Sequence, residues 1–267
     1  MPDILNTAYQ DNIQTLNVYD SDLARTNSSY AAFEQNKLVC LLDSKQKPSA
    51  LMELVHDSFR ALVLSSRFSC VGAKAALHKG TYRMGMYGEM NTPGTNAGLA
   101  RDLFAFVQEQ PYMESGFTTF IASFAEPHPV DEADFERLLW QQLQALHDLD
   151  APLHAWDTSV SSDPENPAFS FSFAGRAFFI IGMSPASSRW SRRFAWPTLV
   201  FNAHNQFEQL RERGKFRSIR DTIRARETAL QGSYNDALSD FGEQSEARQY
   251  AGRAVEQDWR CPFHAHS

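Results

Sequence analysis

The stretch FSFSFAGRAFFIIGM, residues 169–183, carries the clearest fold signal in the chain. Its first half alternates phenylalanine with serine, which is the two-residue period of a strand with one buried face. Gly175 and Arg176 then suit a two-residue turn with glycine first, and a second apolar run follows them. The segment is therefore predicted to form a β-hairpin.

Further elements are expected on both sides of this hairpin. Strands are predicted at residues 82–88, 116–124 and 198–201. Helices are predicted at residues 29–42, 48–63, 94–108, 131–147, 202–214 and 216–230, with Asp131 and Asn202 as N-caps. This order favours an α+β fold, with a mainly antiparallel sheet of about five strands packed against several helices. Residues 1–27 are polar without a period and are expected to form a weakly ordered arm before a single domain at 28–267.

Composition excludes several classes of protein. The 267 residues are 43% hydrophobic and 21% charged, which is typical of a globular protein. The net charge of −7 argues against nucleic-acid binding, and no apolar run is long enough to span a membrane. Three cysteines are too few for a disulfide framework, and the start MPDILNTAYQDN does not resemble a secretory signal. Cytoplasmic residence is therefore expected.

Histidines offer three candidate sites. His204, in FNAHNQF, follows a strand at a helix start, where it could ligate a metal, exchange protons or only cap the backbone. The group His147, Asp150 and His154 could bind non-haem iron or be a polar helix end. A third group could bind zinc, although it lacks a Cys-x-x-Cys partner; it consists of Cys261, His264 and His266.

Arginines cluster between residues 189 and 226 of this acidic chain. Those of the 216–230 helix are expected to form a solvated face paired with Glu and Asp. Arg189, Arg192 and Arg193 lie between two apolar strands, where their guanidinium groups could hold an anionic ligand. Hydrolase chemistry is disfavoured, because GMSPA lacks the second glycine of a nucleophile elbow and no glycine-rich phosphate loop exists.

Several motifs together resemble one protein family. They are FSC at residues 68–70, SSRxxRRF at 187–194, VFNxHxQFExLRxxG at 200–214, SEARQYxGR at 245–253 and WRCPF at 259–263. In this order they are similar to the YqcI/YcgG family, whose members carry an FPC motif early and a CPF motif late. The similarity runs from about residue 50 to 263. Ser69 replaces the proline of FPC, Ser184 stands where the family commonly has histidine, and Asn235-Asp236 replaces its Asn-Pro.

The resemblance implies a haem b protein, because characterised relatives are haem-dependent N-oxygenases that hydroxylate guanidino nitrogens. It implies an amine or guanidine substrate, O2 and an electron donor. His204 is then the favoured axial ligand, with Cys70 and His154 next. The three arginines would pair with haem propionates or a substrate carboxylate. Further roles are expected for Phe171 and Phe173 as apolar walls, and for Glu246 and Arg248 in orienting polar substrate groups.

Two other readings stay open at this point. One is a haem- or small-molecule-binding protein without turnover. The other is a structural or regulatory protein in which Cys70 and Cys261 are ordinary packed thiols. Under the haem reading these two cysteines are expected to come close together or share a pocket. The oligomeric state is open, and a homodimer is among the options.

Overall fold

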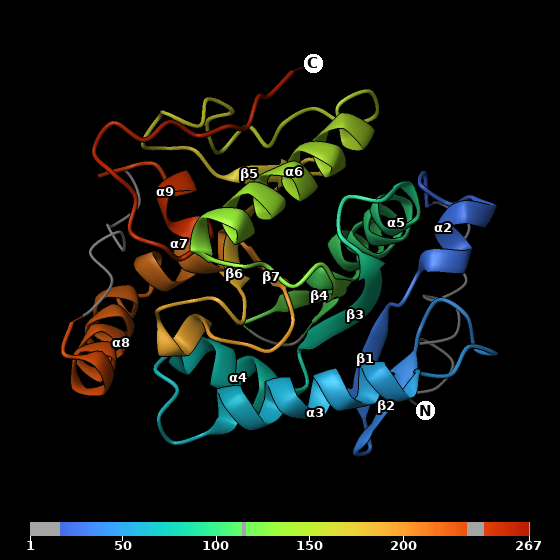
Figure 1. Ribbon diagram of the computed structural model, residues 1–267, viewed down its shortest axis with the longest axis horizontal. Helices are drawn as coiled ribbons and strands as arrows, with labels where there is room; N and C mark the ends of the chain where they lie inside the picture. Colours follow the sequence, from blue (N-terminus) through green and yellow to red (C-terminus); the bar gives the residue numbers. More distant parts are fainter. Residues whose placement is uncertain (1–16, 114–115, 234–242, 267) are drawn as a thin grey trace.

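The computed structural model describes residues 17–113, 116–233 and 243–266. Its core is a seven-stranded mixed sheet with the order β2-β1-β3-β4-β7-β6-β5 (Figure 1). Only β3 and β4 pair in parallel; every other neighbouring pair is antiparallel. The strands are β1 (Ala31–Glu34), β2 (Lys37–Cys40), β3 (Tyr82–Glu89), β4 (Thr119–Glu126), β5 (Phe171–Phe173), β6 (Arg176–Met183) and β7 (Thr198–Ala203). The α+β class is confirmed, whereas the sheet has seven strands rather than five.

Helices cover both faces of this sheet (Figure 1). In the described residues they are α2 (Asp22–Asn27), α3 (Ala50–Leu64), α4 (Val71–Lys79), α5 (Pro93–Glu109), α6 (Glu132–Asp150), α7 (Asn205–Glu212), α8 (Phe216–Gln231) and α9 (Ala247–Tyr250). One core cluster packs α5 and α6 against the sheet, and a second packs α3 and α4 against its other face. No helix of the described ranges has the length and apolarity needed to cross a membrane.

The predicted hairpin exists as β5 and β6, with Phe171 opposite Phe178 and Phe173 opposite Arg176. Its turn lies one residue earlier than expected. Ala174 and Gly175 are the central residues, and their φ angles of 52° and 68° are both in the left-handed region. Two consecutive positive φ values are the geometry of the type I′ turn that matches strand twist, so the residue before the glycine enters the turn.

The helix predicted at residues 29–42 is wrong, because this segment forms the hairpin of β1 and β2. Its turn is Gln35–Asn36, with φ angles of 48° and 65°. Asn tolerates the left-handed conformation better than most residues, and its position between two short apolar runs is the signal for a turn. The spacing of apolar residues in this segment fits both the helical and the strand period, and pairing of β1 with β3 selects the strand.

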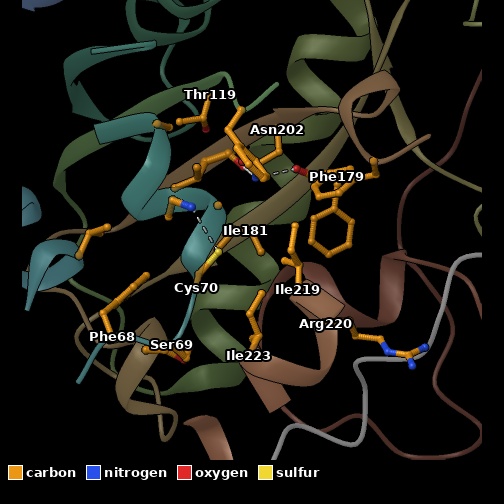
Figure 2. Close-up of a pocket in the computed structure, with 18 of the residues that line it drawn as sticks. Phe68, Ser69, Cys70, Thr119, Phe179, Ile181, Asn202, Ile219, Arg220 and Ile223 are labelled. Carbon is orange, nitrogen blue, oxygen red and sulfur yellow. Dashed lines mark hydrogen bonds between the residues drawn. The ribbon is translucent and has the colours of Figure 1, made fainter. Parts of the chain in front are cut away.

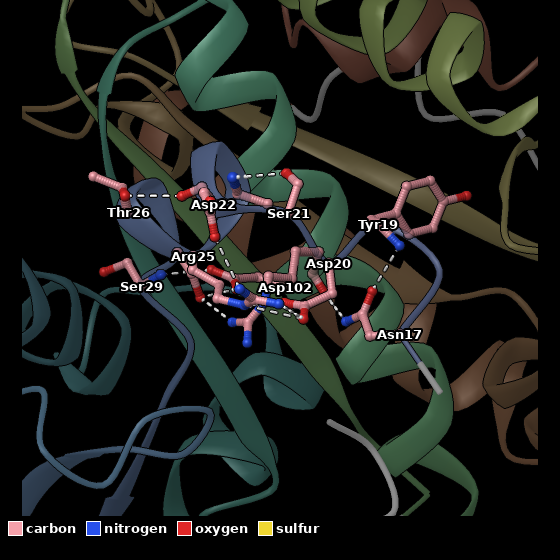
Figure 3. Close-up of polar contacts among 12 residues, drawn as sticks. Asn17, Tyr19, Asp20, Ser21, Asp22, Arg25, Thr26, Ser29 and Asp102 are labelled. Carbon is pink, nitrogen blue, oxygen red and sulfur yellow. Dashed lines mark hydrogen bonds and ion pairs between the residues drawn. The ribbon is translucent and has the colours of Figure 1, made fainter. Parts of the chain in front are cut away.

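Residues 17–27 belong to the segment expected to be a weakly ordered arm; residues 1–16 lie outside the described ranges. In the structure, α2 lies along α5 and is held by polar contacts (Figure 3). Arg101 Nε donates to Asp20 Oδ1 at 2.7 Å, and Asn17 Nδ2 donates to the carbonyl of Arg101 at 2.8 Å. A Cβ at Gly98 would lie 2.2 Å from the carbonyl oxygen of Asn27, so glycine permits this close approach.

Candidate functional site

A cavity of about 290 Å³ lies between one face of the sheet and the helices α4, α7 and α8 (Figure 2). Its walls are largely apolar, with side chains contributed from strands β6 and β7 and from the inner face of α8. The main apolar lining residues are Phe59, Phe68, Ile181, Val200, Ile219 and Ile223. Seven charged side chains also line it: Arg189, Arg192, Arg211, Arg220, Arg224, Glu227 and Glu246. Arg220 and Arg224 thus face the cavity, whereas the arginines of the 216–230 helix were expected to form a solvated face. Arg192, Glu227 and Glu246 are buried, and a buried charge is costly.

Cys70 faces this cavity from the N-cap position of α4. Its Sγ accepts a hydrogen bond from the backbone N–H of Ala73 at 3.4 Å, and the pKa of the thiol is raised by burial. Gly72 keeps this turn small, since a Cβ there would lie 3.0 Å from the ring of Phe117. A helix N-terminus favours an anion, so a thiolate ligated to a metal here would receive backbone N–H support.

Arg192 is a buried cation on the same wall, 7% exposed. Its guanidinium donates to three backbone carbonyls, those of Gly182 at 3.0 Å, Tyr250 at 3.2 Å and Gln249 at 3.4 Å. Burial lowers its pKa to about 10, and Glu227 opposes that shift. None of the described aspartates and glutamates lies within salt-bridge distance of it, so its charge can face an anionic ligand while its bonds join β6 to α9.

Gly182 explains how α9 reaches β6. A Cβ on Gly182 would lie 2.7 Å from the carbonyl oxygen of Tyr250 and equally close to the side chain of Leu139. Glycine is therefore required for the SEARQY segment to pack against the strand. This contact places the SEARQY segment beside β6, and both contribute residues to the cavity lining.

Two buried carboxyl groups line the cavity, and they differ in their partners. Glu227, from α8, accepts a hydrogen bond from the hydroxyl of Ser69. Glu246 has the phenol of Tyr250 at 3.5 Å and Nδ1 of His204 at 3.8 Å. Burial raises the pKa of Glu246 to about 8. One wall of the cavity thus carries an acid that can hold its proton at neutral pH.

His204, the favoured ligand from the sequence, is 2% exposed and is not among the residues that line the cavity. It occupies the N-cap of α7, a place predicted for Asn202, which instead stays in β7 and faces the cavity. Burial, and then the charge of Arg211, lower the pKa of His204 to about 4. The structure therefore places a neutral imidazole behind Glu246 rather than in the cavity.

The remaining predicted polar residues divide between the cavity and the surface. Arg189 lines the cavity, where it donates to the carbonyl of Ser233 at 3.0 Å. Arg193 is exposed and donates to the carbonyl of Ser187 at 2.8 Å. Arg248 lies over the ring of Trp259, 5.5 Å from its centroid, outside the cavity lining. Of the predicted set, the structure brings together Cys70, Arg189, Arg192 and Glu246.

Phe171 and Phe173 lie on the opposite face of the sheet, in the core beneath α6. His154 is also on that side, where its Nδ1 contacts Asp150 Oδ1 at 2.8 Å. Alternate residues of a strand point to opposite faces, so β6 presents Phe179 to the cavity and Phe178 to the core. The unbroken apolar run around Phe179 is typical of a strand covered on both faces, and it was the signal that could have identified this wall from the sequence.

The two other metal hypotheses find no support in the geometry. Within the described ranges, no group of three or more His, Cys, Asp and Glu side chains is arranged to hold a metal ion. His147 Nε2 accepts the backbone N–H of His266 at 2.9 Å, and His266 Nε2 contacts Asp148 Oδ1 at 2.9 Å. These histidines fasten the C-terminal segment to α6.

Cys70 and Cys261 do not share a pocket. Cys261 is buried in the core cluster of α5 and α6, whereas Cys70 packs against the cluster on the other face of the sheet. The CPF segment is instead an aromatic anchor, since Phe263 contacts the rings of Trp140 and Trp156 at centroid distances of 6.2 Å and 6.0 Å. The prediction that the two cysteines meet is wrong, because the sheet separates them.

The pair of Glu246 and His204 predicts a specific dependence of stability on pH. The folded-state pKa of Glu246 is raised from 4.5 to about 8. The stability that protonated Glu246 adds to the folded state is therefore fully present below pH 4.5 and is lost as pH rises through about 8. His204 acts oppositely between pH 4 and 6.5, where only the unfolded imidazole takes up a proton. From pH 6.5 to about 8, Glu246 should lower the free energy of unfolding by on the order of 2 kcal/mol.

Urea unfolding at a series of pH values measures this slope. Glu246→Gln removes the titrating group while keeping its size, so the variant is expected to lose the decline above pH 6.5. Parallel pH profiles for the wild type and the variant would contradict the assignment.

Fold and site together define an α+β protein with a largely apolar cavity that carries a thiol, five arginines, of which one is buried, and two buried carboxyl groups. The chain belongs to the YqcI/YcgG family, whose family model matches residues 59–264. It is 27% identical over 209 residues to the uncharacterized protein YqcI of Bacillus subtilis strain 168, covering 74% of this chain and 81% of that protein. No solved structure matches the chain.

Proposed function

We propose that the protein holds haem b in this cavity and hydroxylates an amine or guanidino nitrogen of a small metabolite. The observation that carries the proposal is the thiol of Cys70, which faces a largely apolar cavity from a helix N-cap. The motif resemblance to haem-dependent N-oxygenases agrees with it. Cys70 takes the place of His204 as the proposed axial ligand, because no histidine is among the cavity-lining residues of the described chain.

The wall residues fit such a group. Apolar side chains from the sheet and α8 suit a porphyrin, and Arg189 and Arg192 suit its propionates or a substrate carboxylate. Ser184, at the position of the family's usual histidine, is fully buried and is not a lining residue, so this departure removes no side chain from the wall. When bound, haem would supply O2 binding and the oxidising power, tuned by its axial ligand.

The chain's own side chains would bind and orient the substrate. The carboxylate of Glu227 is a suitable acceptor for the N–H groups of an amine or guanidine. The apolar lining would exclude water from the reacting nitrogen. Overall, one oxygen atom enters an N–H bond and the other leaves as water. This balance needs two protons and two electrons, the electrons from an external flavin or iron–sulfur reductant.

A binding protein without turnover is the second candidate. Ser69, at the proline position of the FPC motif, donates its hydroxyl to Glu227. This bond occupies part of the carboxylate that a substrate nitrogen would need. The observation favours a protein that retains the cavity but in which Glu227 is already engaged by Ser69.

Reconstitution with haemin, followed by an absorption spectrum and an assay of O2 uptake with guanidines and amines, separates the candidates. A Soret band with substrate-dependent formation of an N-hydroxylated product supports the oxygenase. A Soret band without turnover supports the binding protein. Absence of a band in folded protein would overturn both haem proposals.

A further inference from the structure

The hydrogen-bond donors around Glu246 are already committed elsewhere. The hydroxyl of Tyr250 donates to the carbonyl oxygen of Phe178 at 3.2 Å and also accepts the backbone N–H of Phe171 at 3.0 Å. A phenol has one proton, so it cannot also be donated across the longer, 3.5 Å contact with Glu246 Oε2. A hydrogen bond in that contact needs a proton carried by Glu246.

Ser170 repeats this pattern. Its side chain is a neighbour of the Glu246 carboxyl, yet its hydroxyl donates to the same carbonyl of Phe178 at 3.0 Å. The two lone pairs of that carbonyl therefore take both available hydroxyl protons. Both hydroxyls therefore have a backbone carbonyl as an alternative acceptor, which weakens the support that they give to a carboxylate at Glu246.

The cost of burying a charge at Glu246 is also not offset by an ion pair with a lysine or arginine of the described residues. Among the described residues, no lysine or arginine lies within salt-bridge distance of the Glu246 carboxyl, whose side chain is 7% exposed. The charged and titratable groups around the pair are His204 and Arg211 on α7, Tyr250 on α9 and Asp157 before β5. His204 Nδ1, at 3.8 Å, is too far for a hydrogen bond. An unpaired buried carboxylate is costly, so the neutral acid is the favoured state.

We propose that Glu246 carries its proton at neutral pH and is the proton donor of the cavity wall, with Tyr250 as the acceptor that orients its O–H. The ligand it suits is one that brings an oxygen or nitrogen acceptor to this wall. Its use in turnover rests on the proposed function, because the hydroxylation consumes protons. There the O–H bond of the carboxyl would break and its proton would go to the oxygen that leaves as water.

Infrared spectroscopy of the full, haem-free chain tests the protonation state directly. The wild type at neutral pH is expected to show the carbonyl band of an un-ionised carboxylic acid, shifted in D2O and absent in Glu246→Gln. The band should disappear with a midpoint near pH 8. Glu227→Gln is the matched control, because Glu227 lines the same cavity but accepts from Ser69, so the band should persist in that variant.

Tyr250→Phe tests the direction of the hydrogen bond. If Glu246 donates to Tyr250, losing the acceptor destabilises the neutral acid, and the midpoint should move to lower pH. A shift of the midpoint to higher pH would mean that Tyr250 donates to a carboxylate at Glu246, and it would overturn the proposal. Absence of the carboxylic acid band from the wild type at neutral pH would show an ionised Glu246 and would overturn it as well. Because the protein carries no haem in this experiment, a failure of haem binding leaves the result intact.

Discussion

Replacing Cys70 with serine is expected to remove the thiolate-type spectrum of the haem-loaded protein, including the red-shifted band of its ferrous–CO complex. Thiolate sulfur gives that signature, and a serine hydroxyl does not provide an equivalent ligand. Serine is a preferred N-cap residue, so the variant should keep the cap of α4 and the fold. The absorption spectra of the ferric and ferrous–CO forms provide the measurement.

His204→Ala is the matched comparison for Cys70→Ser. His204 is buried behind Glu246 and outside the cavity lining, so its removal is expected to leave the ligation signature unchanged. The sequence alone favours the opposite outcome, with His204 as ligand. A spectrum lost in His204→Ala and retained in Cys70→Ser would return the ligand role to histidine and would require the α7 start to rearrange on haem binding.

Replacing Arg192 with methionine is expected to cause the largest loss of stability among substitutions at the cavity. The change removes donors from three backbone carbonyls, those of Gly182, Tyr250 and Gln249. Each buried acceptor left unsatisfied costs about 1–3 kcal/mol, so the total should be at least about 3 kcal/mol. The free energy of unfolding in urea gives the value, and ligand binding should weaken with it because α9 loses its attachment to β6.

Arg193→Met is the control for this substitution. Arg193 is the next residue and also donates to backbone carbonyls, but it is exposed, and water can replace it. Its loss should change the free energy of unfolding by less than about 0.5 kcal/mol. Equal losses for the two variants would show that Arg192 is not the buried connection between motifs.

Local patterns in the sequence determined most of the secondary structure. Alternating phenylalanines predicted β5 and β6, and Asp131 marked the start of α6, where its side chain accepts from the N–H of Asp134. These features depend on neighbours within a few residues, so they can be read before the fold is known. The hairpin of β1 and β2 could not be predicted in this way. Its short apolar runs fit both a helix and a strand, and only pairing with β3 decided between the two.

The sequence also selected Cys70, Arg192 and Glu246 as residues of interest, because each lies in a motif that resembles the family. Only the tertiary structure decided which of the candidates meet. Side chains alternate across a strand, so the register of the sheet placed Phe179 in the cavity and Phe171 in the opposite core. Likewise Cys261, though in a matching motif, lies across the sheet from Cys70, because a sheet divides residues by face and not by their order along the chain.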